Sequence, residues 1–203
     1  MISAQESLQR LRDGNRRFVS SLGSAEMQVH RSVKLTQEQS PFAIILGCSD
    51  ARVPAEIVFD QGLGDLFVIR VAGNVVAPSQ VGSVEFAASR FNTRLVVVLG
   101  HSRCGAVLAT IEELQRPKEN QSINLRSIVD RVRPSVEGLM RTELKDDLQT
   151  LVGHAVRSNV RASVDHLRHG SALLENLIRH EGLMVVGAEY SLETGVVEFF
   201  DGV

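Results

Sequence analysis

Short runs of apolar residues alternate along this chain with longer segments in which apolar residues recur every three or four positions. The short runs are rich in β-branched residues and are typical of buried strands, whereas the longer segments are typical of amphipathic helices. Strands are predicted at residues 42–46, 66–71, 95–99, 183–188 and 196–200. Because helical segments separate the first four strands, we expect a parallel sheet with right-handed crossovers. A short turn at Gly195 joins the last two strands and predicts an antiparallel hairpin at one edge.

Helices are predicted at about residues 3–18, 79–91, 104–115, 122–140, 142–168 and 171–180. Ser3 and Glu6 have the spacing of a capping box, which marks the start of the first helix. Pro134 should break the helix that contains it, and Gly182 should end the last helix. The pattern predicts an α/β fold, with a central, mainly parallel β-sheet that has an antiparallel edge and is flanked by helices. We expect a single domain over residues 1–203 with an N-terminal helical arm at 1–40, because residues 20–41 are polar and irregular.

Composition narrows the class of protein. The 203 residues are 43% hydrophobic, which is enough for a sizeable core. A net charge of −2 and an isoelectric point near 6.3 give no general case for binding nucleic acid or a membrane. The apolar runs are far shorter than the roughly 20 residues of a membrane helix, and the first residues lack the apolar core of a signal peptide. A cytoplasmic protein is expected, and a reducing compartment argues against a disulfide between its two cysteines.

Two similar phrases carry the candidate chemistry. Each is an apolar run that ends in Leu-Gly and then in a metal-binding side chain, Cys48 in the first phrase and His101 in the second, which continues to Cys104. A ligand directly after a buried strand lies at the carboxyl edge of an open α/β sheet, where such folds build their sites. Two cysteines and one histidine suit zinc, and three protein ligands leave a fourth position open. A helix that starts near Cys104 would favour its thiolate, and glycines at 47, 100 and 105 permit close backbone approach.

Asp50 and Arg52 follow Cys48 in the same loop. Arginine holds a carboxylate through two parallel hydrogen bonds, which keeps the carboxylate ionised and fixed in direction. Beside a metal, such a carboxylate can orient a reacting oxygen or can itself fill the fourth position in a closed state. The alternative interpretation is an aspartate that caps the next helix and an arginine on the surface. Next to a metal-ligand phrase we favour the functional interpretation.

These phrases resemble a known family. Cys48-Ser-Asp-Ala-Arg-Val-Pro54 and His101-Ser-Arg-Cys-Gly105 look like the two signature phrases of the β-class carbonic anhydrases, in their bacterial type. The similarity extends to the stretch from Asp60 to Asn74 and to Gly82-Ser-Val-Glu-Phe-Ala87. The resemblance implies zinc at Cys48, His101 and Cys104, with Asp50 and Arg52 as the catalytic pair. It implies reversible hydration of carbon dioxide to bicarbonate and a proton, which makes the chain a zinc lyase.

The resemblance also implies residues for substrate. Gln39 and Phe67 stand at the family's substrate-binding positions, and Val71 and Ala72 would complete an apolar wall for carbon dioxide. The chain departs from plant-like members at Ala72, where they have valine, and at Phe86, where they have tyrosine. In the family the N-terminal arm wraps a partner, so that Gln39 and Phe67 would serve the neighbour's site in a dimer or tetramer.

A regulatory bicarbonate site of another subgroup is incomplete here. That subgroup uses a tryptophan, an arginine and a tyrosine, and the tryptophan position is Ile45 in this chain. Arg70 and Tyr190 match the other two positions. The incomplete trio weakens the case for such a switch.

Two other functions remain open at this point. One keeps the metal and changes the substrate to carbon disulfide or carbonyl sulfide, which are hydrolysed by some proteins of this fold. The other is a non-catalytic zinc protein, which would hold its ion with four protein ligands, Asp50 being the fourth. The partners expected in every case are small molecules and further copies of the chain, with no nucleic acid and no membrane.

Overall fold

The computed structural model describes residues 2–22, 39–116 and 122–203. In this part of the chain, five strands form one sheet in the order β2-β1-β3-β4-β5. The strands are β1 (Ala43–Gly47), β2 (Leu66–Arg70), β3 (Leu95–His101), β4 (Met184–Tyr190) and β5 (Val197–Asp201). The first four are parallel and β5 is antiparallel to β4. The predicted mainly parallel sheet with an antiparallel edge is therefore confirmed, and each strand lies within about two residues of its predicted place.

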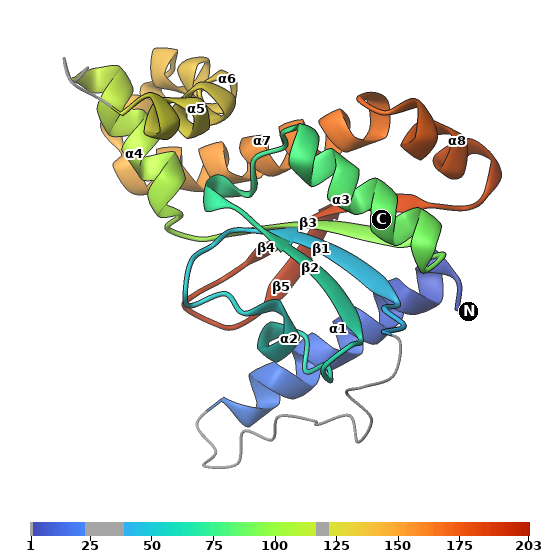
Figure 1. Ribbon diagram of the computed structural model, residues 1–203. Helices are drawn as coiled ribbons and strands as arrows, with labels where there is room; N and C mark the ends of the chain where they lie inside the picture. Colours follow the sequence, from blue (N-terminus) through green and yellow to red (C-terminus); the bar gives the residue numbers. More distant parts are fainter. Residues whose placement is uncertain (1, 23–38, 117–121) are drawn as a thin grey trace.

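Helices cover both faces of the sheet (Figure 1). The α-helices are α1 (Ala4–Ser21), α2 (Ala55–Val58), α3 (Pro78–Arg90), α4 (Gly105–Gln115), α5 (Ile123–Val132), α6 (Pro134–Glu137), α7 (Leu148–His169) and α8 (Ala172–His180). Short 3-10 turns are η1 (Ala72–Asn74), η2 (Leu139–Arg141) and η3 (Glu143–Asp146). One face packs against α1 and α2, and the other against α3, α7 and α8. None of the described helices is long and apolar enough to cross a membrane.

A third apolar cluster lies beyond the carboxyl edge of the sheet. There α4 and α6 pack against the first half of α7, α5 packs on α4 and α6, and the cluster includes Cys48 and Cys104. The two cysteines are thus embedded in a helical cap rather than in the sheet itself. This cap supplies the dry surroundings of the metal centre described below.

Local signals set several of the boundaries. The capping box at Ser3 and Glu6 is present, with both reciprocal hydrogen bonds formed. The chain breaks between α5 and α6 at Pro134, as predicted. The helix predicted at 142–168 is instead split, because Asp147 caps α7 through the Thr150 N–H at 3.1 Å and ends the preceding turn. The short helix α2 was not predicted.

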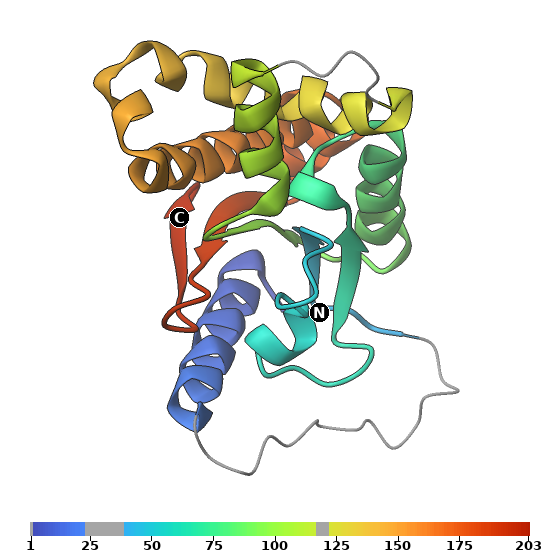
Figure 2. The same ribbon diagram turned by 90° about the vertical axis from the view of Figure 1, so that its left-hand side faces the viewer.

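The first helix packs on its own sheet instead of projecting from it. Leu8, Leu11 and Phe18 are buried in the same cluster as the inner residues of β1 and β3. Asn15 joins α1 to the hairpin, since its amide donates to the Gly195 carbonyl at 2.9 Å and accepts from the Val197 N–H at 2.8 Å. Figure 2 shows α1 running beside this hairpin. Residues 23–38, the rest of the predicted arm, lie outside the described residues.

Candidate metal centre

The strand order places the two ligand phrases next to each other. Since β1 lies between β2 and β3, the chain leaves the carboxyl ends of β1 and β3 in opposite directions across the sheet. Such a switch point opens a crevice at which open α/β sheets bind ligands. Cys48 directly follows β1, and His101 is the last residue of β3. Register pairs Gly47 with Leu99, so the two ligand positions lie on neighbouring strand ends.

The His101 ring is held so that one of its nitrogens is free to bind a metal. The side chain is fully buried, and its Nδ1 contacts the Ser102 carbonyl oxygen at 2.9 Å. A proton on Nδ1 that donates to this carbonyl leaves Nε2 with its lone pair free. Within the described residues, Nε2 is buried with no hydrogen-bond partner. Buried polar atoms in folded proteins almost always have a partner. A buried Nε2 without one fits a metal ligand.

Cys104 reaches the same point through a tight turn. Arg103 adopts a left-handed conformation with φ of 55°, which turns the chain within three residues of His101. Cys104 is then the N-cap residue of α4, as the sequence predicts. Its side chain is 2% exposed.

The three side chains form one compact cluster. The ligand atoms of Cys48, His101 and Cys104 all lie within 4.8 Å of one another, and all three residues are buried. Two sulfurs and an imidazole nitrogen are donors that zinc prefers. The residues present therefore fit a zinc ion with three protein ligands.

The two thiols shift each other's pKa in opposite directions. Hydrogen bonding from Cys104 is the main cause that lowers the pKa of Cys48, helped by His101 and by the Gly73 N–H. The same pairing, together with burial, raises the pKa of Cys104. Backbone N–H groups at the start of α4 act to lower the pKa of Cys104, as the sequence predicts. The interaction with Cys48 and the burial of the thiol outweigh them. Zinc binding would release any proton left on the pair because both ligands bind as thiolates.

His101 responds to the same negative charge. Burial works to lower the pKa of His101, but the nearby Cys48 sulfur outweighs it and raises the pKa. A metal at Nε2 would replace the proton that this thiolate attracts.

Asp50 and Arg52 form the predicted pair. Arg52 Nε and Nη2 donate to the two carboxylate oxygens of Asp50 at 2.9 and 2.8 Å, and the Arg52 N–H donates to one of them at 3.0 Å. The hydrogen bonds from Arg52 hold the pKa of Asp50 far below its usual range. One carboxylate oxygen lies 3.9 Å from His101 Nε2. The carboxylate is therefore ionised, fixed and directed at the cluster.

Arg70 supports this loop, a role that sequence analysis missed. From the end of β2 its guanidinium donates to the Cys48 carbonyl at 3.1 Å and to the Asp50 carbonyl at 2.6 Å. It therefore holds the backbone on both sides of Ser49. The family resemblance had suggested Arg70 only as part of an incomplete bicarbonate site, because local sequence does not show which carbonyl groups a side chain reaches.

The four residues expected at the substrate divide into two groups. Val71 packs against the cluster that holds both cysteines, and Ala72 is exposed at the start of η1 beside it. Gln39 is exposed ahead of β1, and Phe67 pairs with Ile44 near the amino end of β2. Within one chain, the structure brings Val71 and Ala72 to the metal centre and leaves Gln39 and Phe67 at the opposite end of the strands. The roles of all four stay predictions.

Comparison with known proteins identifies the family of this site. The sequence profile of the family described as carbonic anhydrase matches residues 43–197, which run from the first residue of β1 to the first residue of β5. A curated carbonic anhydrase from Mycolicibacterium smegmatis is 40% identical over 194 residues, covering 93% of this chain and 89% of its own length.

Solved structures agree in fold. The β-carbonic anhydrase CafA of Aspergillus fumigatus superposes with a TM-score of 0.74 at 25% identity, covering 84% of this chain and 80% of that one. One of two tetrameric β-carbonic anhydrases from Sordaria macrospora gives a TM-score of 0.72 at 23% identity, covering 82% of this chain and 84% of that one. With its matching profile, its similar relative and its Cys-His-Cys cluster at the β1/β3 crevice, the chain belongs to the β-carbonic anhydrase family.

Proposed function

We propose that this chain hydrates carbon dioxide reversibly to bicarbonate and a proton at the Cys48–His101–Cys104 cluster. One observation carries the proposal: three converging sulfur and nitrogen ligands lie beside a carboxylate that an arginine fixes through two hydrogen bonds. Family membership supports the same reaction.

The three-ligand set favours a catalytic zinc site over a structural one. Structural zinc sites are closed by four protein ligands, whereas catalytic sites keep one position open. Among the described residues, Asp50 is the neighbour suited to be a fourth ligand, and both of its oxygens accept hydrogen bonds from Arg52. When bound, zinc lowers the pKa of a water ligand from 15.7 to roughly 7 and so supplies a nucleophile at neutral pH.

The roles of the chain's own residues follow from their positions. Asp50 accepts a hydrogen bond from the attacking oxygen and turns its lone pair toward the carbon of carbon dioxide. Arg52 keeps Asp50 ionised and prevents it from moving onto the metal. Arg70 holds the backbone of the same loop and so fixes the position of the pair. Preorganised groups of this kind lower the barrier without moving during the reaction.

The substrate wall is proposed to have two sources. Val71 and Ala72 supply apolar surface from the chain's own crevice, which suits a small apolar molecule. Gln39 and Phe67 are proposed to complete the site of a neighbouring copy, because they lie at the wrong end of their own strands.

Self-association as a dimer or tetramer therefore forms part of the proposed function. The rings of Phe67, Phe86 and Phe91 form a cluster with centroid separations from 5.7 to 6.2 Å beside the edge strand β2. Phe86 is 54% exposed, which is a large exposed fraction for an aromatic side chain and is typical of a surface that binds another protein chain. The β-carbonic anhydrase from Sordaria macrospora that shares this fold is tetrameric.

The cytoplasm is the proposed compartment. Both cysteines are free thiols, and the zinc set needs both of them reduced. A reducing environment maintains that state.

Stopped-flow measurement of carbon dioxide hydration by the zinc-loaded protein tests the proposal, between pH 6.5 and 9. We expect turnover well above the buffer rate, and none with Cys104→Ala, which should lose the metal. Zinc-loaded protein that leaves the hydration rate at the buffer value would point to a non-catalytic site. Faster turnover of carbon disulfide than of carbon dioxide would favour the hydrolase alternative.

A further inference from the structure

The η1 turn holds a strained backbone against the metal centre. Gly73 and Asn74 are both left-handed, with φ of 67° and 44°. Non-glycine residues rarely adopt this conformation, although asparagine tolerates it better than most. In this geometry the Gly73 N–H donates to Cys48 Sγ at 3.4 Å. The turn thus delivers a hydrogen bond to one of the three ligand atoms.

Two side chains from one face of α7 hold the turn in place. Asn159 Nδ2 donates to the Gly73 carbonyl at 2.7 Å, and Ser163 Oγ donates to the Asn74 carbonyl at 3.0 Å. Their spacing of four residues places both on the same helical face. Asn159 is 2% exposed and Ser163 is 5% exposed, so both hydrogen bonds are shielded from water.

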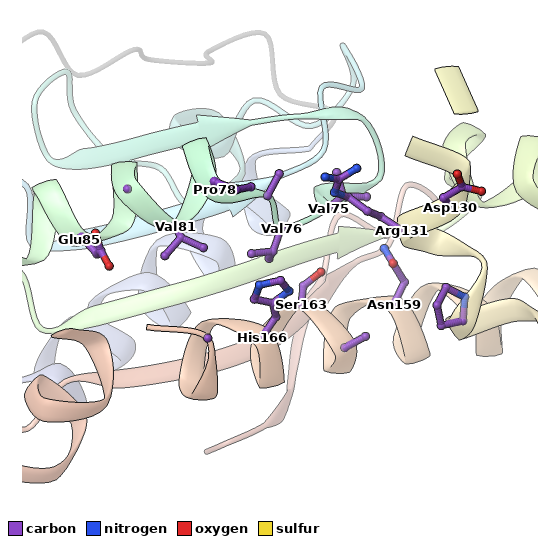
Figure 3. Close-up of a pocket in the computed structure, with 15 residues that line it drawn as sticks. Val75, Val76, Pro78, Val81, Glu85, Asp130, Arg131, Asn159, Ser163 and His166 are labelled. Atoms are coloured by element: carbon purple, nitrogen blue, oxygen red, sulfur yellow. The ribbon is translucent and has the colours of Figure 1, made fainter. Parts of the chain in front are cut away.

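Asn159 and Ser163 line a cavity of about 680 Å³ between α3 and α7. Figure 3 shows the side chains of Asn159 and Ser163 reaching from α7 toward the segment that carries Val75 and Val76. On the other side of the turn, a Cβ added at Gly73 would lie 3.1 Å from the Ala106 Cβ of α4. The turn is therefore held between α4 and α7.

We propose that Asn159, assisted by Ser163, is a positioning residue for the metal centre, which sets the Gly73 N–H against Cys48 Sγ and so orients and stabilises this sulfur as a metal ligand. The inference rests on the proposed function only in taking Cys48 as a zinc ligand. Hydrogen bonds to a metal's ligands commonly change its affinity by 10- to 100-fold. Asn159 acts through the turn and touches neither metal nor substrate.

Metal binding, rather than turnover, tests this inference. We expect Asn159→Ala to bind zinc about 10-fold more weakly in competition with a chromophoric chelator. The cobalt(II)-loaded variant should show a shifted sulfur-to-cobalt charge-transfer band, because the thiolate has lost its hydrogen bond. Ser163→Ala should change both quantities in the same direction, with a loss of about 3-fold for its single neutral hydrogen bond.

Asn15→Ala is the matched control. Asn15 is also a buried asparagine that bonds to backbone groups, but it joins α1 to the β4–β5 hairpin. It should lower the stability of the protein and leave zinc affinity and the cobalt band unchanged.

The inference is overturned if Asn159→Ala folds and matches the parent in zinc affinity and cobalt spectrum, or if Asn15→Ala shifts the band equally. Should Asn159→Ala fail to fold, an unshifted band and unchanged zinc affinity in Ser163→Ala overturn it alone. A parent protein that bound no zinc would instead refute the metal centre itself, and this inference with it.

Discussion

At the scale of single residues, the chemistry of this site depends on which groups hold each side chain. Asp50 alone could serve as a metal ligand or as an oriented acceptor. The two parallel hydrogen bonds from Arg52 favour the second role, since they hold both carboxylate oxygens at the guanidinium and still leave a lone pair that can accept a hydrogen bond. The role of His101 is set in the same way, because its Nδ1 contacts the Ser102 carbonyl and its Nε2 is left for the metal.

Substituting either member of the pair should therefore affect rate more than metal content. Asp50→Asn should keep zinc and lose at least ~10-fold in carbon dioxide hydration, because it no longer orients the attacking oxygen. Arg52→Ala should free Asp50 to coordinate zinc and lower activity at every pH from 7 to 9, again with metal retained. Arg179→Ala, which removes an exposed pair with Glu175 on α8, is the control and should match the parent. Parent rates in both test variants would favour the capping interpretation of this loop.

The pH range over which the Asp50–Arg52 pair stays intact follows from the direction in which the pKa of Asp50 is shifted. Because Arg52 lowers the folded-state pKa of Asp50, the stabilisation by the pair is complete above the unfolded value of about 3.9 and is lost as pH falls through the lower folded value. The pair should thus stay intact from pH 6.5 to 9. We expect the activity of Asp50→Asn to rise with pH at the same midpoint as the parent, only lower. A displaced midpoint in stopped-flow profiles would show that Asp50 itself titrates in this range.

At the scale of elements, the two Leu-Gly phrases are not equivalent. A Cβ at Gly100 would lie 2.5 Å from Val160 Cγ2, because α7 packs directly on β3 there. A Cβ at Gly47 would meet nothing closer than the Leu99 carbonyl oxygen at 3.8 Å. The sequence suggested close approach at both positions, and the packing requires it only at the second.

The pair of glycines offers a matched test of this packing. Gly100→Ala should lower the free energy of unfolding by about 1–3 kcal/mol, since α7 must shift to admit the methyl group. Gly47→Ala should change it by less than about 1 kcal/mol, the size of the backbone-entropy effect alone. Urea denaturation at equal zinc occupancy measures both values. Equal losses in the two variants would contradict the assignment of the contact to α7.

Asn15 tests how firmly α1 belongs to its own sheet. Asn15→Ala leaves the buried Val197 N–H without its acceptor and removes two donated hydrogen bonds. We expect a loss of about 2–3 kcal/mol in unfolding free energy, the cost of an unsatisfied buried group together with lost hydrogen bonds. A loss below ~0.5 kcal/mol by chemical denaturation would show that α1 contributes little in solution.

At the scale of the whole molecule, the proposed active site is divided between copies. Gln39, ahead of β1, and Phe67, near the amino end of β2, lie at the opposite end of the sheet from the chain's own zinc ligands, and Phe67 packs in the aromatic cluster that contains the exposed Phe86. One assembly would cover the aromatic rings and complete the sites together.

A charge placed in the aromatic cluster should separate the copies. Phe86→Glu is expected to lower the oligomeric state in light scattering at micromolar concentration and to reduce activity while zinc content stays at one per chain. Ile123→Glu is the control, because Ile123 is 85% exposed on α5 and lies outside this cluster. A parent that is monomeric, or a Phe86→Glu variant with unchanged assembly, would refute the shared site.

Much of the fold was predictable because its signals are local. Apolar runs located the strands, Pro134 located a helix break, and the capping box located the first helix start. The split before α7 was missed because Leu144 and Leu148 keep helical spacing on both sides of Asp147, and period alone does not reveal the cap.

The sequence by itself predicted the Cys-His-Cys cluster and the Asp50–Arg52 pair, because Cys48, Asp50 and Arg52 share one loop, and His101 and Cys104 another. The tertiary structure decided how those loops meet and what supports them. Arg70 reaches the Asp50 carbonyl across 20 residues, and Asn159 reaches the Gly73 carbonyl across 86. Such bonds join positions whose separation along the chain carries no periodic signal, so only the packing of strands and helices brings them together.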